Sequence, residues 1–140
     1  WLSDMNQQAG PDCLIVGGES VVDLSGALPE SRGGRNQHLG LAALEHWEHT
    51  QNRNWQRGEI CFVSGGTDGE DGNTTVAGVC LSPELRERCS REELDIRAYL
   101  DTKNSYNYFR QTGGLLITGN TQTNVCDLQV GVVRQRLASS

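Results

Sequence analysis

The segment Ser31–His38 carries residue types that suit the binding of an anion. Gly33 and Gly34 precede Arg35 and Asn36 where a helical pattern begins. Free N–H groups and the positive dipole end of a helix favour a phosphate or carboxylate, and glycines let it approach the backbone. Arg35 adds a planar, permanently charged, bidentate donor. The segment predicts an anion site, and the alternative is a structural loop whose arginine pairs with an acid.

A second glycine-rich segment, residues 64–75, follows an apolar run. Its first residues are small or hydroxylated, and their amides and hydroxyls can surround an anion: Ser64, Gly65, Gly66 and Thr67. Asp68 and Asp71 are candidate ligands for a cation that bridges to that anion. The alternative is a loop built from Asx turns, because the spacing of the acids does not fit an EF-hand.

Two more polar segments adjoin predicted strands. Gly17-Gly18-Glu19 combines backbone freedom with a carboxylate, although a plain hairpin turn explains it as well. The segment 118–127 offers hydroxyls, amides and one acid, for a ligand pocket or an Asx-rich turn. No segment fits the phosphate-loop or dinucleotide-binding fingerprints, so a nucleotide would have to bind by another route.

Short apolar runs alternate with helix signals along the chain. The predicted strands cover residues 13–16, 21–24, 60–63, 76–81, 115–118 and 128–133. Predicted helices run from Arg35 to about His49, from Ser82-Pro83-Glu84 to about Arg91, and from Asn104 or Ser105 to Gly113. The alternation indicates an α/β layered domain with helices packed on a sheet. The short link between the first two strands predicts a hairpin, which makes the sheet mixed.

Composition excludes several classes of function. The 140 residues carry a formal charge of −6, which argues against a nucleic-acid or anionic-membrane surface, because clustered Lys and Arg hold those partners. The length fits one domain. Five cysteines without a C-x-x-C pair indicate buried free thiols in a reducing compartment. We therefore expect a cytoplasmic protein, with a mitochondrial location as the alternative.

Taken in order, five segments resemble the successive motifs of one family. They are Gly17-Gly-Glu, Gly33-Gly-Arg-Asn-Gln, Ser64-Gly-Gly-Thr-Asp-Gly-Glu-Asp-Gly, Asn104-Ser-Tyr-Asn-Tyr-Phe and Thr118-Gly-Asn-Thr-Gln-Thr-Asn-Val-Cys-Asp. The chain resembles the C-terminal, leucine-rich (MOFRL) domain of the two-domain glycerate 2-kinases, over about residues 12–134. Residues 1–140 would then form a single domain, the C-terminal part of a longer protein.

The resemblance implies an ATP-dependent kinase that forms 2-phosphoglycerate from D-glycerate, with Mg²⁺, in a cleft shared with an N-terminal kinase domain. This chain alone would be inactive. We expect Arg35 to be the catalytic cation, which binds the carboxylate of glycerate or the transferring phosphoryl group, and Asp68 or Asp71 to position Mg²⁺ or a substrate hydroxyl. A further set is expected to bind substrate or phosphate: Glu19, Gly33, Gly34, Asn36, Ser64, Gly65, Gly66 and Thr67. Some relatives carry the older name hydroxypyruvate reductase, but no dinucleotide fingerprint supports a redox role.

This sequence departs from the family pattern at several motif positions. The family usually has Glu at His38, Asp at Thr75, Asn-Asp at Lys103-Asn104 and Asn at Cys126. The glycine framework is retained while acids and amides are replaced. The alternative function is therefore a non-catalytic regulatory or metabolite-binding module.

Overall fold

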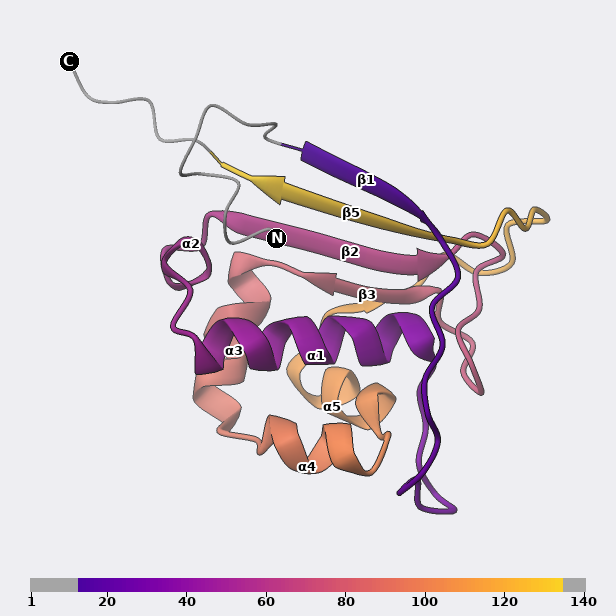
Figure 1. The fold of residues 1–140 in the computed structure, drawn as a ribbon, viewed down its shortest axis with the longest axis horizontal. Coiled ribbons are helices and arrows are strands. Elements are labelled where there is room, and N and C mark those ends of the chain that lie inside the picture. Colours follow the sequence, from indigo (N-terminus) through magenta and orange to yellow (C-terminus); the bar gives the residue numbers. More distant parts are fainter. Residues whose placement is uncertain (1–12, 135–140) are drawn as a thin grey trace.

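A five-stranded sheet organises the chain, and the computed structural model describes residues 13–134 (Figure 1). The strands are β1 (Cys13–Gly18), β2 (Ile60–Gly66), β3 (Gly78–Leu81), β4 (Leu115–Leu116) and β5 (Asp127–Val133), in the spatial order β1-β5-β2-β3-β4. Every pairing in this sheet is antiparallel. The predicted α/β layered fold is confirmed, although no parallel pair makes this sheet mixed.

Five helices complete the described fold: α1 (Arg35–His49), α2 (Arg53–Gln56), α3 (Pro83–Glu92), α4 (Ile96–Asp101) and α5 (Ser105–Thr112). The three predicted helices are confirmed, since α1 has the expected bounds and Ser82 caps α3 through its hydroxyl. The short helices α2 and α4 were not predicted. Asn52 and Asp95 cap them, each by accepting a backbone N–H with its side chain.

The helices and one face of the sheet share one hydrophobic core. On β2, Ile60 and Phe62 point into this core, while Cys61 points to the opposite face. Leu41 and Leu44 of α1 are fully buried against the sheet. This alternation follows from the period-two geometry of a strand, which sends successive side chains to opposite faces.

The glycine in the middle of α1 sets how closely this helix approaches the sheet. A Cβ added to Gly40 would lie 2.3 Å from Cγ1 of the fully buried Val79 on β3. A glycine within a helix costs about 1 kcal/mol relative to alanine, so close packing explains its presence here.

The predicted hairpin between residues 13–16 and 21–24 is wrong. β1 pairs with β5, which lies more than 100 residues later in the sequence. Residues 19–24 form no strand and run past the N-terminal end of α1 (Figure 1). Val21 is 93% exposed, so its β-branched side chain marks a surface and not a core strand.

The cysteines also depart from prediction. All five thiols are free, but Cys13, Cys61 and Cys126 are exposed, and Cys80 and Cys89 are half-buried. The expected burial is therefore wrong for three of them. No helix within residues 13–134 has the length and apolar character that a membrane span requires.

Gly40→Ala tests the close packing of α1 on β3. We expect the free energy of unfolding to fall by about 1–2 kcal/mol, because overpacking a filled core outweighs the gain in helix propensity. Urea unfolding at equilibrium measures this change. In a Val79→Ala background the same substitution should cost at least about 1 kcal/mol less, and strictly additive costs would contradict the contact.

Candidate functional site

Four segments that the sequence marked as polar meet at one end of the sheet. The end of β1, the start of α1, the loop after β2 and the loop before β5 all lie at the right of Figure 1. The strand register explains the meeting, because Gly18, Asp127 and Gly66 stand in one row across β1, β5 and β2. The sheet thus brings together residues that are more than 100 positions apart.

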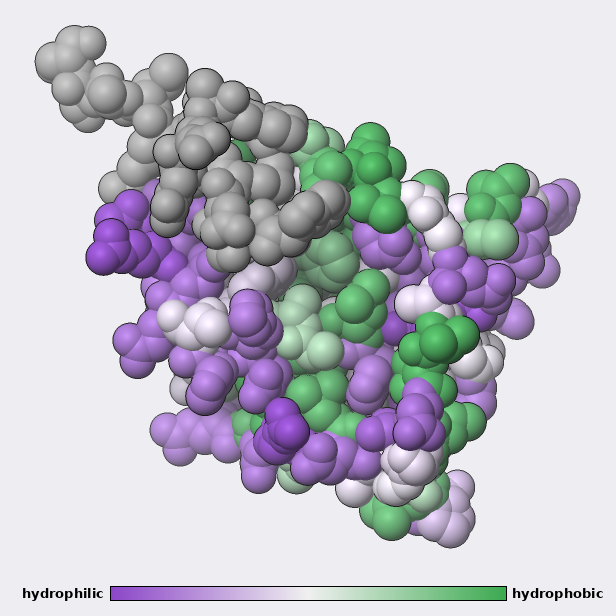
Figure 2. All heavy atoms as spheres, in the orientation of Figure 1, coloured by the Kyte–Doolittle hydropathy of each residue, from purple (hydrophilic) through white to green (hydrophobic). Residues whose placement is uncertain are grey.

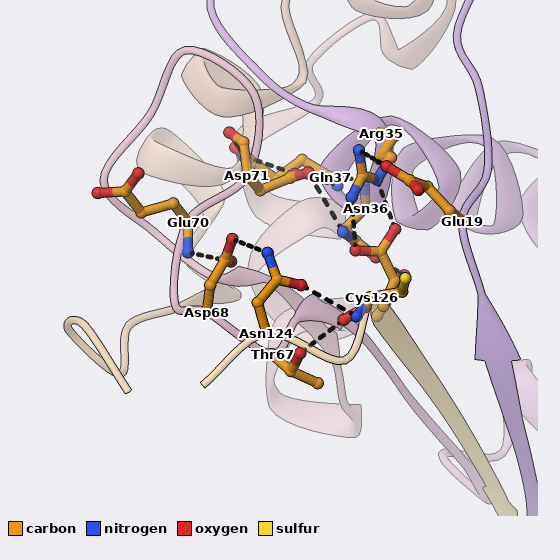
Figure 3. Close-up of polar contacts among 12 residues, drawn as sticks. Glu19, Arg35, Asn36, Gln37, Thr67, Asp68, Glu70, Asp71, Asn124 and Cys126 are labelled. Atoms are coloured by element: carbon orange, nitrogen blue, oxygen red, sulfur yellow. Dashed lines mark hydrogen bonds and ion pairs between the residues drawn. The ribbon is translucent and has the colours of Figure 1, made fainter. Parts of the chain in front are cut away.

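Arg35 lies between two carboxylates (Figure 3). Its Nε donates to Asp127 Oδ2 at 2.5 Å and its Nη2 donates to Asp127 Oδ1 at 3.0 Å, a bidentate pair. Its Nη1 lies 2.8 Å from Glu19 Oε1. The hydrogen bonds that Arg35 donates to Asp127, and then the charges of Asp127 and Glu19, raise the pKa of the guanidinium further above its usual range. Arg35 is therefore a fixed cation.

The two partners of Arg35 differ in accessibility. The Asp127 side chain is fully buried, whereas the side chains of Glu19 and Arg35 are 56% and 36% exposed. The buried Asp127 holds Nε and Nη2 of the guanidinium, and the exposed Glu19 pairs with Nη1. An exposed ion pair contributes about 0–1 kcal/mol, so an anion in solution can compete with Glu19 for that edge.

Asp71 occupies the N-terminal end of α1, where the sequence predicted an external anion. Its Oδ1 accepts the Asn36 backbone N–H at 3.1 Å, and its Oδ2 accepts the Gln37 backbone N–H at 2.9 Å. The N-cap residue, Gly34, has no side chain to do this. A Cβ on Gly34 would lie 2.3 Å from the Asp71 carboxylate, so glycine is required for the approach. The helix start is capped from within the protein.

Two amide side chains complete the shell of Asp71. Asn36 Nδ2 donates to Oδ1 at 3.2 Å, and Gln37 Nε2 donates to Oδ2 at 2.9 Å. Ser64 Oγ then donates to Asn36 Oδ1 at 2.6 Å, which ties α1 to β2. Asn36 and Ser64 are fully buried. These residues, predicted to bind substrate, instead join the helix to the sheet.

The loop after β2 is joined to the loop before β5 (Figure 3). Thr67 Oγ1 donates to the Cys126 carbonyl at 2.7 Å and accepts the Val125 N–H at 2.8 Å. Asn124 Nδ2 donates to Asp68 Oδ2 at 3.1 Å. Within the second loop, the side chains of Asn120 and Asn124 accept the N–H two residues on. The predicted Asx turns are therefore present.

A pocket of about 440 Å³ opens beside Arg35. Four residues of the predicted site line it: Glu19, Gly33, Gly34 and Arg35. Its wall also contains His38 from the next turn of α1, and Lys103 and Ser105 from the α4–α5 junction. Burial, and then the charge of Lys103, lowers the pKa of His38. Neither Lys103 nor Asp127 was among the predicted site residues, although Lys103 is the only lysine and Asp127 is the one acid of the segment 118–127.

The remaining predicted residues lie elsewhere. Gly65, Gly66 and Thr67 line a separate hollow of about 260 Å³ that also contacts Val63 and Val130, on the sheet face opposite α1. Asp68 is solvent-accessible at the loop surface, while Asp71 is 3% exposed and holds the helix. Within residues 13–134, no group of three acidic, histidine or cysteine side chains is placed to hold a metal ion. The structure thus divides the predicted set between two hollows and a buried network.

The MOFRL family pattern matches residues 12–127. The chain belongs to the MOFRL family. It is 42% identical over 140 residues to a glycerate kinase of Macaca fascicularis, covering 96% of this chain and 33% of that protein. It is 38% identical over 123 residues to a D-glycerate 2-kinase of Thermotoga maritima, covering 88% of this chain and 27% of that protein.

Solved structures agree with this membership. The crystal structure of a glycerate kinase from Thermotoga maritima superposes with a TM-score of 0.68 at 36% identity, covering 87% of this MOFRL chain and 27% of that chain. A protein from Pyrococcus horikoshii superposes with a TM-score of 0.77 at 26% identity, covering 96% of this chain and 30% of that chain. The chain thus spans about a quarter to a third of the length of the relatives it matches.

Asp71→Asn tests the internal cap of α1. The amide keeps the shape but loses the charge, and its NH₂ group faces N–H donors, so we expect stability to fall by about 2–3 kcal/mol. Urea unfolding of both proteins measures the loss. Glu70→Gln is the matched control, because Glu70 is an exposed acid of the same loop, and it should change stability by less than about 0.5 kcal/mol. Equal effects from the two substitutions would contradict the cap.

His38 should make the domain sensitive to mild acid. Its folded pKa lies below the unfolded value, so as pH falls through about 6.5 the unfolded state takes up a proton first and stability is lost. Unfolding free energies at pH 7.5 and pH 5.5 should differ more in the natural protein than in His38→Gln. Parallel profiles for the two proteins would show that His38 titrates normally.

Proposed function

We propose that this chain is the C-terminal domain of a D-glycerate 2-kinase and contributes to transfer of a phosphoryl group from ATP to D-glycerate. Membership of the MOFRL family and about 40% identity to glycerate kinases support the proposal. The product is 2-phosphoglycerate. The reaction takes place in a cleft between this domain and the N-terminal kinase domain, so this chain alone is inactive.

The observation that carries the proposal is the position of Arg35 at the wall of the 440 Å³ pocket. Asp127 fixes its orientation from the buried side. Phosphoryl transfer needs little covalent help from the protein, because positioning and stabilisation of charge supply most of the catalysis. A cation that is held before the substrate arrives does not have to reorganise during the reaction.

A substrate must displace Glu19 to contact Nη1 of Arg35. Glu19 covers Nη1, the guanidinium edge that faces away from Asp127. A carboxylate or phosphate that enters the pocket replaces Glu19 there, and Glu19 returns to solvent at small cost because it is exposed. Gly33 and Gly34 line the same pocket and leave the backbone open to the ligand.

ATP and Mg²⁺ are the proposed cofactors. Asp68 and Asp71 both accept hydrogen bonds, but Asp71 is 3% exposed whereas Asp68 is only half-buried, so Asp68 is the better placed of the two predicted acids for the metal. Mg²⁺ is commonly held by one or two carboxylates together with substrate phosphates and water. Asp68 fits this limited role, since one half-buried carboxylate does not make a complete metal site. When bound, the ion neutralises charge that develops on the transferred phosphoryl group.

The N-terminal kinase domain is the proposed partner. Apolar side chains lie at the surface along the segment that follows β1, at the right of Figure 2. Val21, Leu24 and Leu28 in this segment are exposed. The segment borders the pocket, because Val21 and Leu24 also line it. A further domain that covers these residues would close the pocket and exclude water.

The direct test is release of ADP from Mg-ATP in the presence of D-glycerate, by the longest natural form of the protein. This chain alone is the control. Turnover by the long form, and none by the short form, is the expected result. If neither form turns over while D-glycerate or 2-phosphoglycerate raises the melting temperature of the long form, the regulatory metabolite-binding function is the correct one.

Arg35→Ala in the long form should lower kcat/KM for D-glycerate by at least about 100-fold, because a fixed cation on the transition state contributes several kcal/mol. Arg35→Lys should recover little, since lysine cannot make the bidentate contact with Asp127. Steady-state kinetics measure both. Arg110→Ala removes an exposed arginine of α5 and serves as the control. A loss below threefold in Arg35→Ala would remove Arg35 from the reaction.

A further inference from the structure

Three buried polar atoms without a hydrogen-bond partner among residues 13–134 belong to side chains that line the pocket beside Arg35. They are Ser20 Oγ, His38 Nδ1 and Ser105 Oγ. Ser105 is 1% exposed, so its hydroxyl is almost completely shielded from solvent. A buried polar group that lacks a partner costs about 1–3 kcal/mol. Three such groups around one cavity indicate that a polar ligand completes them.

Lys103 brings a positive charge to this pocket, and no carboxylate of the described residues pairs with it. Within the described chain, no carboxylate lies at ion-pair distance from its Nζ. Nζ donates a hydrogen bond of 3.3 Å to the Leu100 carbonyl. The nearby Asp23 is fully exposed and accepts hydrogen bonds from Ser25 instead. Arg35, in contrast, already has two carboxylate partners.

The backbone at Lys103 is fixed by the end of α4. The Lys103 N–H bonds the Leu100 carbonyl at 3.1 Å and the Asn104 N–H bonds the Tyr99 carbonyl at 2.9 Å, which is a Schellman motif. Lys103 has φ 55°, the left-handed conformation that glycine or asparagine adopts most easily. Ser105 begins α5 two residues later, so both side chains are mounted on one rigid turn.

We propose that Lys103, the hydroxyls of Ser20 and Ser105, and the imidazole of His38 form an oxyanion-binding subsite of the pocket beside Arg35. The ligand is a small anion whose oxygens accept hydrogen bonds from these groups. Resting on the proposed function, two groups meet this description: the carboxylate end of D-glycerate and the terminal phosphate of the nucleotide. Lys103 binds the group that Arg35 does not.

The charges of the pocket support this division. Arg35 together with Glu19 and Asp127 carries a formal charge of −1, so an anion gains from Arg35 only after Glu19 leaves. Lys103 can attract an anion without displacing any partner. Burial, and then the charge of Lys103, lowers the pKa of His38 and so favours the neutral imidazole, which can donate with one nitrogen and accept with the other. A hydroxyl or phosphate oxygen of the ligand can therefore supply the hydrogen-bond partner that His38 Nδ1 lacks.

Lys103→Asn and Lys103→Arg in the long form test the subsite. Asparagine tolerates the left-handed backbone and deletes the charge, while arginine retains the charge. We expect Lys103→Asn to weaken binding of one ligand by about 10- to 100-fold, as for a hydrogen bond to a charged group, and Lys103→Arg to remain within about fivefold. Titration calorimetry with D-glycerate and with Mg-ATP measures binding separately. Arg110→Asn is the control.

The ligand that loses affinity identifies the bound group. A loss confined to D-glycerate assigns the subsite to the carboxylate, and a loss confined to Mg-ATP assigns it to the phosphate. Ser105→Ala should weaken the same ligand by about 3- to 10-fold. Binding of both ligands within twofold of the natural protein in Lys103→Asn would overturn the proposal.

A second measurement separates this proposal from the proposed function. Lys103 is the only lysine of the 140 residues, so its reaction with an amine-selective reagent can be followed on a single peptide by mass spectrometry. Inorganic phosphate or D-glycerate should slow the reaction of the unsubstituted long form at least threefold. Protection without kinase turnover would retain the subsite and remove the kinase function. Equal labelling with and without both anions would remove the subsite even in an active enzyme.

Discussion

The carboxylate of Asp71 at the start of α1 is the interaction on which the site depends. It replaces the side chain that the N-cap glycine lacks, and two backbone amides and two side-chain amides converge on it. Because Arg35 is the first residue of this helix, the cap also fixes where the guanidinium points. The same network reaches Ser64 on β2. The buried carboxylate of Asp71 therefore stabilises the fold and also positions the site, and it lies at the helix end where the dipole favours a negative charge.

Charge in this domain is arranged locally, against an overall charge of −6. Arg35 is compensated on both sides, once by a buried acid and once by an exposed one. Lys103 stands on the same pocket without a contact ion pair among the described residues. Arg35 is thus held in a fixed orientation by its two acids, whereas the charge of Lys103 is not neutralised by a contact ion pair within residues 13–134. An acidic domain can bind an anion because the charges that line the pocket, and not the net charge of the domain, set the electrostatic potential there.

Local signals in the sequence predicted helices well and long-range pairing poorly. The spacing of apolar residues gave α1 from Arg35 to His49, and Ser82-Pro83 gave the start of α3. The partner of β1 could not be predicted, because a short glycine turn favours a hairpin with the next apolar run, whereas β1 pairs with β5, more than 100 residues later in the sequence. An anion was predicted at the start of α1, but as a bound ligand, whereas the structure places the carboxylate of Asp71 there. Nothing in the local sequence shows that Asp71 folds back to supply it.

The pairing of β1 with β5 has a consequence for how the domain can be connected. Cys13 stands opposite Val132, so the first and last described strands enter and leave at the same end of the sheet, while Arg35 and its pocket lie at the other end. Adjacent ends of this kind allow a domain to be inserted into, or permuted within, a longer polypeptide. The ends of the MOFRL domain can therefore be joined to a longer polypeptide in different ways without altering the loops around Arg35.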